Sequence, residues 1–405
     1  MVQTRGEQML ALRRSRMAAA PPILRGGFRP FFLGGAVWAV VALALWLTAL
    51  AGQIAIPSTF DALSWHRHEM LFGFVGAVIA GFLLTAIPNW TGRLPIAGPP
   101  LAALFGLWLA GRLAMLFSVE LGPAVAATID VGFYLVLAAV AAREVIEANN
   151  RNVPIVGLVL LFGIANGLDH VAAAGIAVDP ELPWQLAVGL VTLMISLIGG
   201  RIVPSFTRNW LAKRGVTQGL PGQPGRFDQL AIGLTALGLL AWIAAPAGWL
   251  PGTLLAFAAA AQAVRLARWK GWKAIPDPLV LVLHIGYAWV PIGLALLAAS
   301  QLEPVLPRSA AIHALTAGAM GTMILAVMTR ATLGHTGREL RAGPGTSVIY
   351  LLVTAGAVLR VAASLGGVDY RVGLEVAGLC WLGGFLLFIV VYGPILFAPR
   401  VGERR

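Results

Sequence analysis

The chain has 405 residues, of which 59% are hydrophobic and only 11% are charged, whereas soluble domains carry about a quarter charged residues. This composition excludes an ordinary soluble enzyme, because too few polar residues remain to cover a water-facing surface. The net charge of +12 does not indicate nucleic-acid binding, since Lys and Arg are spread along the chain and do not gather in one soluble segment. The composition therefore predicts a membrane protein whose main partner is the lipid bilayer.

Apolar runs of about twenty residues, the length needed to cross a bilayer, recur along the whole chain. Each run is bounded by proline, glycine or charged residues. They predict an all-α polytopic protein with about twelve transmembrane helices. The predicted ranges are 31–51, 67–88, 99–118, 124–146, 154–175, 184–206, 228–247, 250–267, 278–299, 309–331, 345–365 and 373–397.

Most basic residues lie in alternate loops between these segments. With the N-terminus inside, all Lys and Arg residues but Arg67, Arg112, Arg308, Arg360 and Arg371 fall on the inner side. The positive-inside rule then places both termini in the cytoplasm, as an even number of spans requires. Residues 1–30 are expected to form a basic cytoplasmic tail, because the apolar run that follows is too long for a signal-peptide core.

An internal repeat relates the second and tenth predicted helices. HEMLFGFVGAVIAGFLLTAIPNWTGR aligns without a gap on HALTAGAMGTMILAVMTRATLGHTGR, so that His68 matches His313 and Arg93 matches Arg338. The sixth helix is a weaker third copy. This spacing predicts three parallel four-helix repeats, 31–147, 148–268 and 269–405, in a pseudo-threefold arrangement. Parallel repeats differ from the inverted repeats of many transporters.

Histidines within the predicted spans are the main candidate ligands. An ionisable residue inside a span is costly and suggests function, although a hydrogen bond to a neighbouring helix is the structural alternative. His68 and His313 could ligate one haem iron from opposite faces, or share a copper ion. His66 lies about 200° round the helix from His68, so both can face one site only if the helix end unwinds.

The remaining histidines are weaker candidates. His284 and His335 lie toward the inner side and could form a second metal site, although a solvated or carbonyl-bound His335 is equally compatible. His170, beside Asp169, is interpreted more readily as an ion pair or lid contact than as a ligand. Glu69 could orient His68, or form a salt bridge with an arginine, the candidates being Arg67 and Arg112.

Other residues constrain the cofactor. Arg201 and Arg330 could hold haem propionates or a small anion, with lipid headgroups as the alternative. Cys380 is the only cysteine, which excludes an intramolecular disulfide, and no C-x-x-C-H motif is present for covalent haem attachment. Any haem would therefore be b-type, held by axial ligands and packing.

Several long motifs occur together in the order GFRPFF, SWHRHEMLFGF, GFLLTAIPNWTGR, GGRIVPSFT, LHIGYAW and HALTAGAMGTMILAVMTRATLGHTGR. From about Phe28 to Arg341 the chain resembles the NnrS family of bacterial haem and copper membrane proteins. The resemblance implies an inner-membrane protein of twelve helices that accompanies denitrification or nitric oxide stress. It also implies that His66, His68, His284, His313 and His335 are metal-ligand candidates.

The predicted arrangement of twelve helices in three units also resembles the central subunit of haem-copper oxidases, at the level of the fold only. However, the sixth helix carries Trp184 and no His, and the seventh has no His pair, so a copper B site is not expected. We therefore expect a haem and copper protein that binds nitric oxide or another small diatomic ligand, and not a standard oxidase or nitric oxide reductase. The alternative is a solute, metal or haem transporter of twelve helices. The sequence indicates neither a protein partner nor a catalytic residue.

Overall fold

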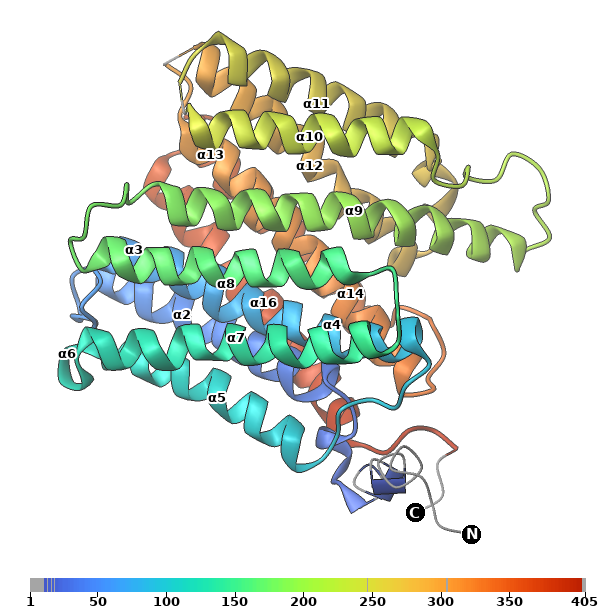
Figure 1. The fold of residues 1–405 in the computed structure, drawn as a ribbon. Coiled ribbons are helices and arrows are strands. Elements are labelled where there is room, and N and C mark those ends of the chain that lie inside the picture. Colours follow the sequence, from blue (N-terminus) through green and yellow to red (C-terminus); the bar gives the residue numbers. More distant parts are fainter. Residues whose placement is uncertain are drawn as a thin grey trace. The chain divides into compact units, whose positions relative to one another are not determined.

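The computed structural model describes residues 11–402 except 13, 16, 18, 246 and 304. Every regular element in these ranges is helical, which confirms the predicted all-α class (Figure 1). Arg5, Arg13 and Arg16 of the predicted basic tail lie outside the described residues, as do Arg404 and Arg405.

The helices follow one another with short connections. Twelve continuous helical stretches among the described residues are long and apolar enough to cross a membrane, which confirms the predicted number. In chain order the elements are η1 Pro22–Leu24, α2 Phe28–Leu50, α3 Ala62–His68, η2 Glu69–Val75, α4 Gly76–Thr91, α5 Pro99–Leu116, α6 Ser118–Leu121, α7 Pro123–Glu147, α8 Val153–Ala173, α9 Leu182–Ala212, α10 Arg226–Ala244, α11 Trp249–Arg268, η3 Gly271–Ala274, α12 Pro278–Leu302, α13 Arg308–His313, η4 Ala314–Gly321, α14 Thr322–His335, α15 Pro344–Ser364 and α16 Tyr370–Phe397.

Most predicted helix ends lie within a few residues of the observed ones. The largest difference is at α9, which continues to Ala212 although the sequence predicted an end at residue 206. The helix passes through Pro204 because an interior proline removes only one backbone hydrogen bond and can be accommodated in a long helix. Thr207, Arg208 and Asn209 are polar and interrupt the apolar run, so hydropathy alone ends the segment too early.

Two compact units make up the chain, and we describe each by itself. The first comprises Met1–Ala187, Ala331–Arg338 and Ile389–Arg405, and in it α2 packs on α4, and α7 packs on both α5 and α8. The second comprises Val188–Arg330 and Glu339–Phe388, and in it α11 packs between α10 and α12. The division into three four-helix repeats stays a prediction.

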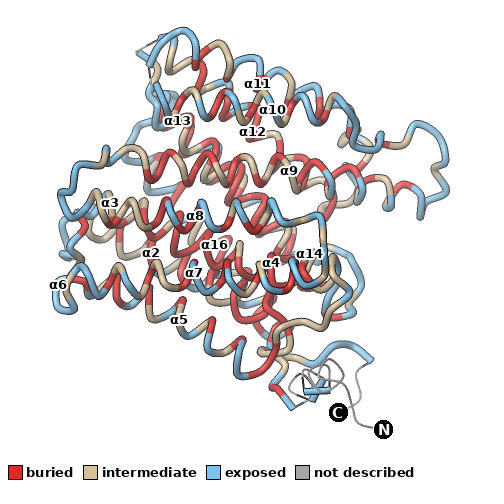
Figure 2. The backbone as a smooth tube through the Cα atoms, viewed as in Figure 1, coloured by how far each residue is buried: buried red, intermediate tan, exposed pale blue. Residues whose placement is uncertain are grey.

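Apolar side chains occupy both the buried and the exposed positions of the helices. Buried and exposed stretches alternate along α7, α8 and α10 (Figure 2). The exposed stretches are themselves apolar, as at Leu135, Leu161 and Leu240, which are all about half exposed or more. Apolar side chains on the outside as well as the inside are what a lipid solvent favours.

The second and tenth spans share an unusual break in the α-helix. In each, a short α-helix ends at the aligned histidine, His68 or His313, and a π-helix begins at the next residue. An α-helix then resumes at Gly76 and at Thr322. A π segment adds a residue to the turn and is frequent at functional sites. The sequence alignment of these two spans thus has a counterpart in their backbone structure.

Candidate metal centre

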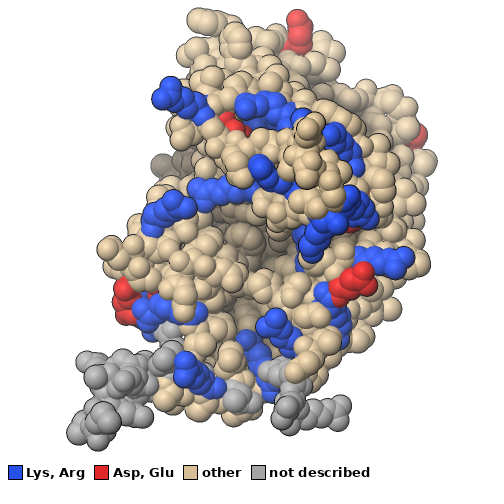
Figure 3. Space-filling model, turned by 90° about the vertical axis from the view of Figure 1, so that its right-hand side faces the viewer, with Lys and Arg blue, Asp and Glu red and all other residues tan. Residues whose placement is uncertain are grey.

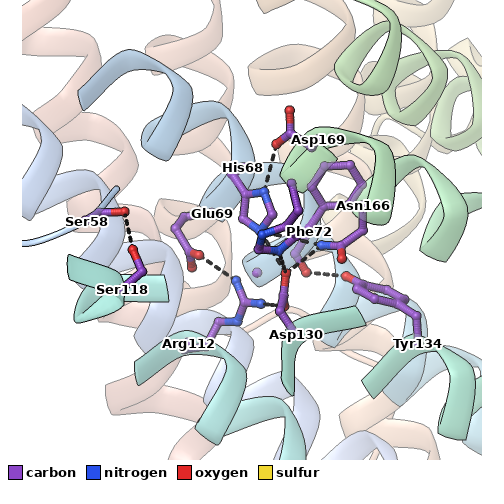
Figure 4. Close-up of polar contacts among 12 residues, drawn as sticks. Ser58, His68, Glu69, Phe72, Arg112, Ser118, Asp130, Tyr134, Asn166 and Asp169 are labelled. Atoms are coloured by element: carbon purple, nitrogen blue, oxygen red, sulfur yellow. Dashed lines mark hydrogen bonds and ion pairs between the residues drawn. The ribbon is translucent and has the colours of Figure 1, made fainter. Parts of the chain in front are cut away.

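His68 is the centre of a buried polar cluster in the first unit. Asp61 caps α3 by accepting hydrogen bonds from the backbone N–H groups of Leu63 and Ser64, and His68 is the last residue of this short helix. The imidazole is fully buried. Its Nδ1 lies 2.8 Å from Asp169 Oδ2 and its Nε2 lies 2.9 Å from Asp130 Oδ2 (Figure 4). Both ring nitrogens are therefore held by carboxylates.

Asp130, on α7, joins the members of this cluster. Its Oδ2 lies 3.1 Å from His170 Nε2 and accepts a hydrogen bond of 2.7 Å from Asn166 Nδ2, in addition to its contact with His68. The three partners come from α3 and α8, so one carboxylate oxygen connects three helices (Figure 4). Asp130 is fully buried, and a buried carboxylate is stable only when it is paired and hydrogen-bonded.

The second oxygen of Asp130 binds a guanidinium. Arg112 Nη2 donates to Asp130 Oδ1, while its Nη1 donates to Glu69 Oε1 at 2.7 Å. The indole N–H of Trp38 donates to the other oxygen of Glu69 at 2.5 Å. Of the two roles predicted for Glu69, the salt bridge with Arg112 is present, while Arg67 instead lies 3.7 Å from Glu181.

The π-helix after His68 makes room for this ion pair. A Cβ added at Gly73 would lie 2.6 Å from Glu69 Oε2 and 2.7 Å from Arg112 Nη1, so only glycine fits there. Two neighbouring side chains bond the carbonyls of the π segment: the indole of Trp108 donates to Gly73 O at 2.9 Å and the hydroxyl of Tyr134 donates to Phe72 O. The backbone groups that the wider turn leaves free are thereby satisfied, as a membrane interior requires.

The cluster lies at one end of the first unit. His68, Arg112, Asp130 and Asn166 are each about 6 to 11 Å along the axis from the nearer end of their continuous spans, at 1.5 Å per residue. These ends are the starts of α3 and α7 and the ends of α5 and α8, which alternate in direction as consecutive spans do. Asp169 is the most accessible member, with 13% of its side chain exposed. The site is therefore buried one to two turns from one end of these four spans.

Three members of the cluster offer metal ligands. One donor atom from each of His68, Asp130 and His170 lies within 4.8 Å of the others. Ligands about 2.1 Å from a tetrahedral metal are about 3.4 Å apart, so the observed separations of 2.9 and 3.1 Å need only small rotations. The amide oxygen of Asn166 is buried nearby without a hydrogen-bond partner among the described residues. Two imidazoles, a carboxylate and an amide oxygen suit a first-row transition metal.

The charges of the cluster also favour a cation. Glu69, Asp130 and Asp169 carry three negative charges when ionised, and Arg112 supplies one positive charge. With neutral imidazoles two negative charges remain, and uncompensated charge inside a membrane span is costly. A divalent cation would balance them. Protonation of both imidazoles is the alternative without a metal.

The same geometry does not suit haem at His68. An axial ligand needs one ring nitrogen on the iron and open space for the flat macrocycle beyond it. Both nitrogens of His68 face carboxylates, and the ring centroids of Phe60, Phe72 and His170 lie 5.1 to 5.2 Å from its own. The His68 site therefore fits a compact ion and not a porphyrin. The predicted haem ligation by His68 and His313 together stays untested.

His66 and His68 point to different surroundings, as the 200° separation predicted. The imidazole of His66 stacks on Trp46 with ring centroids 4.0 Å apart. His335 is exposed at the end of α14 and lies against Phe28, with centroids 5.5 Å apart. Neither of them belongs to the cluster around Asp130.

In the second unit, His313 and His284 lie in separate surroundings. His313 Nδ1 lies 2.7 Å from the carbonyl of Ser309, and no hydrogen bond to its Nε2 is found among the described residues. His284 is buried, with Nε2 2.8 Å from Thr207 Oγ1. A Cβ added at Gly271 would lie 2.5 Å from His284 Nδ1, so this ring is tightly enclosed.

The two arginines predicted to hold an anion have different exposure. Arg201 is exposed on α9. The guanidinium of Arg330 lies over the ring of Phe206, 4.0 Å from its centroid. Lys and Arg side chains gather on the face of the molecule at which α9 ends and α10 begins (Figure 3). The predicted role of Arg201 and Arg330 stays a hypothesis.

Sequence reasoning missed Asp130 and Asn166 and ranked His170 too low. Asp130 is the only acidic residue in the first half of a long apolar helix, and a charge in such a position could have marked it as functional. Asn166 and His170 are four residues apart, so they share one face of α8. His170 lies beside Asp130 and not beside Asp169, because the two neighbours in sequence point about 100° apart on the helix.

Twelve apolar helices, together with a buried cluster of charged and metal-ligating side chains in the first unit, define a polytopic membrane protein with a candidate metal centre. A family model described as NnrS protein matches residues 22–400, nearly the whole chain. The protein therefore belongs to the NnrS family, as its motifs predicted, and is a membrane protein related to the response to nitric oxide. The match extends beyond Phe28–Arg341 at both ends. None of the curated proteins searched matches the chain.

Proposed function

We propose that this protein binds a transition metal, copper in the first place, at His68, Asp130 and His170, and that the metal serves the nitric oxide response. The observation that carries the proposal is the buried group of two imidazoles and one carboxylate with an excess of negative charge. Copper and other first-row metals accept imidazole ligands, and a metal with an open position can bind a small diatomic molecule.

The surrounding residues would each have a definite task at this site. Asp169 accepts the Nδ1 proton of His68 and so keeps Nε2 available as a ligand, an arrangement typical of metal-bound histidine. Arg112 holds Asp130 through its other oxygen and limits the charge of the site. Phe60 and Phe72 enclose the imidazole of His68 and exclude water. Nitric oxide is small and uncharged, so it could reach such a site from the bilayer.

Haem is the second cofactor in this proposal, and His313 is the histidine best suited to it. Its Nδ1–H can donate to the carbonyl of Ser309, which leaves the lone pair of Nε2 directed away from its own helix. This is the usual tautomer of an axial haem ligand. A bound b-type haem would supply a redox-active iron. His284 and His66 are enclosed by Gly271 and Trp46 respectively and have less space for a macrocycle.

We place the metal centre near the outer face of the bacterial inner membrane, with both termini in the cytoplasm. The loops beside the cluster, 51–61, 117–122 and 174–181, contain no Lys or Arg. The opposite ends of the same helices carry Arg93, Arg143 and Arg151. An excess of basic residues on one side favours that side as cytoplasmic.

Metal analysis and optical spectroscopy of the detergent-purified protein test the proposal. We expect about one equivalent of copper in the wild type, and at least a tenfold loss of affinity in Asp130→Asn and His170→Ala, since each removes a ligand. Asp228→Asn is a matched control, because Asp228 is also a buried carboxylate that pairs with an arginine, Arg265, at 2.7 Å. It should keep the wild-type metal content.

Optical spectra of the same purified proteins test for bound haem. We expect a Soret band in the wild type and in Asp130→Asn, and its loss in His313→Ala. Wild-type protein that lacks both metal and colour after expression in copper- and haem-replete cells would refute the proposal and favour the twelve-helix transporter.

A further inference from the structure

Arg360 is a buried cation in the second unit that the proposed metal and haem sites do not use. It lies on α15, four residues before the helix ends at Ser364, or about 6 Å along the axis. Only 8% of its surface is exposed. Its Nη1 donates to Ser364 Oγ at 2.7 Å, and its Nη2 lies 3.5 Å from the hydroxyl of Tyr370 at the start of α16.

Two other deeply buried arginines show what Arg360 lacks. Arg112 and Arg265 are 0% and 1% exposed, and a carboxylate oxygen lies 2.7 Å from each, supplied by Glu69 and Asp228. No carboxylate lies within ion-pair distance of Arg360 among the described residues. Its two hydrogen-bond partners are hydroxyl groups, and its guanidinium carbon lies 5.4 Å from the ring centroid of Tyr370, so none of its contacts carries a full negative charge. Burying a guanidinium without a counter-charge is unfavourable, so a negative group is expected beside it.

The acidic residues nearest in sequence are engaged elsewhere. Asp369 Oδ1 accepts a hydrogen bond from the backbone N–H of Val372 and so caps the first turn of α16. Glu375 pairs with Arg371 at 3.0 Å on the exposed side of the same helix. Neither carboxylate compensates Arg360.

The remaining neighbour, His313, supplies no negative charge to Arg360. α13, which ends at His313, packs on α15, and the guanidinium of Arg360 acts electrostatically on the His313 imidazole. His313 holds the position in its span that His68 holds in the first unit, directly before the π-helix. Around His68 the surrounding charges are carboxylates, whereas beside His313 the charge is a guanidinium. The two related positions therefore have opposite electrostatic environments.

We propose that Arg360, Ser364 and Tyr370 form a binding site for an oxyanion at the end of α15. The guanidinium supplies the charge and a planar pair of donors, which match the geometry of phosphate or carboxylate oxygens. The hydroxyl of Tyr370 can add a further donor. Ser364 Oγ accepts from Arg360 Nη1 and donates to the carbonyl of Arg360 at 3.2 Å, so it fixes the direction of the guanidinium. The site does not depend on the proposed metal centre, because its residues belong to another unit of the chain.

The oxyanion can come from two sources, the phosphate of a lipid headgroup or free phosphate in solution. Both place the same group of oxygens against the guanidinium. The depth of Arg360, about one turn from the helix end, suits a headgroup at the membrane surface. The experiment is designed to separate the two sources.

Thermal unfolding of lipid-depleted protein in maltoside detergent provides the test. One series adds sodium phosphate at constant ionic strength, and another adds phosphatidylglycerol, with diacylglycerol as the matched lipid that lacks phosphate. We expect at least one of the two phosphate compounds to raise the midpoint of the wild type by about 3 °C or more. If both phosphate and phosphatidylglycerol raise the unfolding midpoint, the site is open to solution. If only phosphatidylglycerol raises it, the site binds a lipid headgroup.

Variants show whether the effect belongs to Arg360. Arg360→Gln should lose the shift, while Arg371→Gln, which removes an exposed arginine on α16, should keep it. If Arg360→Gln does not fold, Ser364→Ala with Tyr370→Phe retains the charge and should bind at least threefold more weakly. Equal shifts in the wild type, in Arg360→Gln and in the double variant, or an equal response to diacylglycerol, would overturn the proposal.

Discussion

At the scale of single residues, Arg112 determines whether two buried carboxyl groups, those of Glu69 and Asp130, can coexist. It is the only Lys or Arg within ion-pair distance of Glu69 and Asp130 among the described residues, and all three side chains are essentially inaccessible. Its Nε has no hydrogen-bond partner in the part of the chain that the structure describes, so its whole contribution is to these two carboxylates. A change at Arg112 should therefore act first through charge balance and only second through packing.

Replacement of Arg112 by glutamine should destabilise the protein by about 3 to 5 kcal/mol, the cost of leaving a buried charge without its partner. Adding Glu69→Gln in the same chain should restore part of this loss, since one of the uncompensated charges is removed. Urea-induced unfolding in detergent micelles measures both variants. A double variant that is no more stable than Arg112→Gln would show that packing, and not charge, dominates at this position.

At the scale of elements, the short helix α3 places His68. It begins at Asp61, whose side chain replaces the missing backbone partners of Leu63 and Ser64. Burial alone would raise the pKa of Asp61, but the hydrogen bonds from Ser64 and Leu63 and the nearby Arg67 outweigh it and hold the pKa below its ordinary value. The ionised carboxylate is therefore the form that stabilises the start of the helix.

The stability that Asp61 contributes should depend on pH. Because its pKa is lower in the folded than in the unfolded protein, its contribution is complete above the unfolded value, near pH 4, and is lost as the pH falls through the folded value. Asp61→Ala should cost about 1 kcal/mol at pH 7 and progressively less below about pH 4. Unfolding curves of the two proteins between pH 7 and pH 3 make the comparison. A constant difference over this range would exclude a charged cap.

The π-helices are the second feature at this scale. Each follows its aligned histidine directly, and glycines allow large side chains to approach the wider turn: Gly73 admits the ion pair of Glu69 and Arg112, and Gly318 admits the ring of Trp289. Glycines in a membrane span allow another helix or a flat ligand to approach closely. In the structure side chains of the same chain occupy the space.

At the scale of the whole molecule, the distribution of basic residues among the loops of the twelve spans favours one orientation in the membrane. The expected arrangement has cytoplasmic termini and places the loop after α8 on the outer side. Arg151 and Asp179 are both exposed and lie before and after α8, so they are suited to test the two sides.

Cysteine labelling tests this topology directly. In a Cys380→Ser background, which removes the only cysteine, Asp179→Cys in spheroplasts should react with a membrane-impermeant maleimide. Arg151→Cys should react only after the membrane is broken, since we expect it in the cytoplasm. Labelling of both positions only after lysis, or the reverse pattern, would contradict the proposed orientation.

The sequence by itself determined the class of fold, the number of spans and the family. Hydropathy is a local property that each segment carries alone, and motifs such as SWHRHEMLFGF are long enough to be specific. It also selected His68 and gave Arg67 and Arg112 as candidate partners of Glu69, since a charge in an apolar span needs a partner, and the structure shows Arg112 there. These results depend on composition and spacing along one helix.

Only the tertiary structure decided which other residues surround His68. Asp130 and Asn166 are 62 and 98 residues away from it along the chain, and no periodicity within α7 or α8 records that they face the same point. The structure also separated His66 from His68 and identified Arg360 as a buried cation without a carboxylate. Such neighbours are set by how helices pack and rotate against one another, and side-chain packing between distant segments leaves no signal in the local sequence pattern.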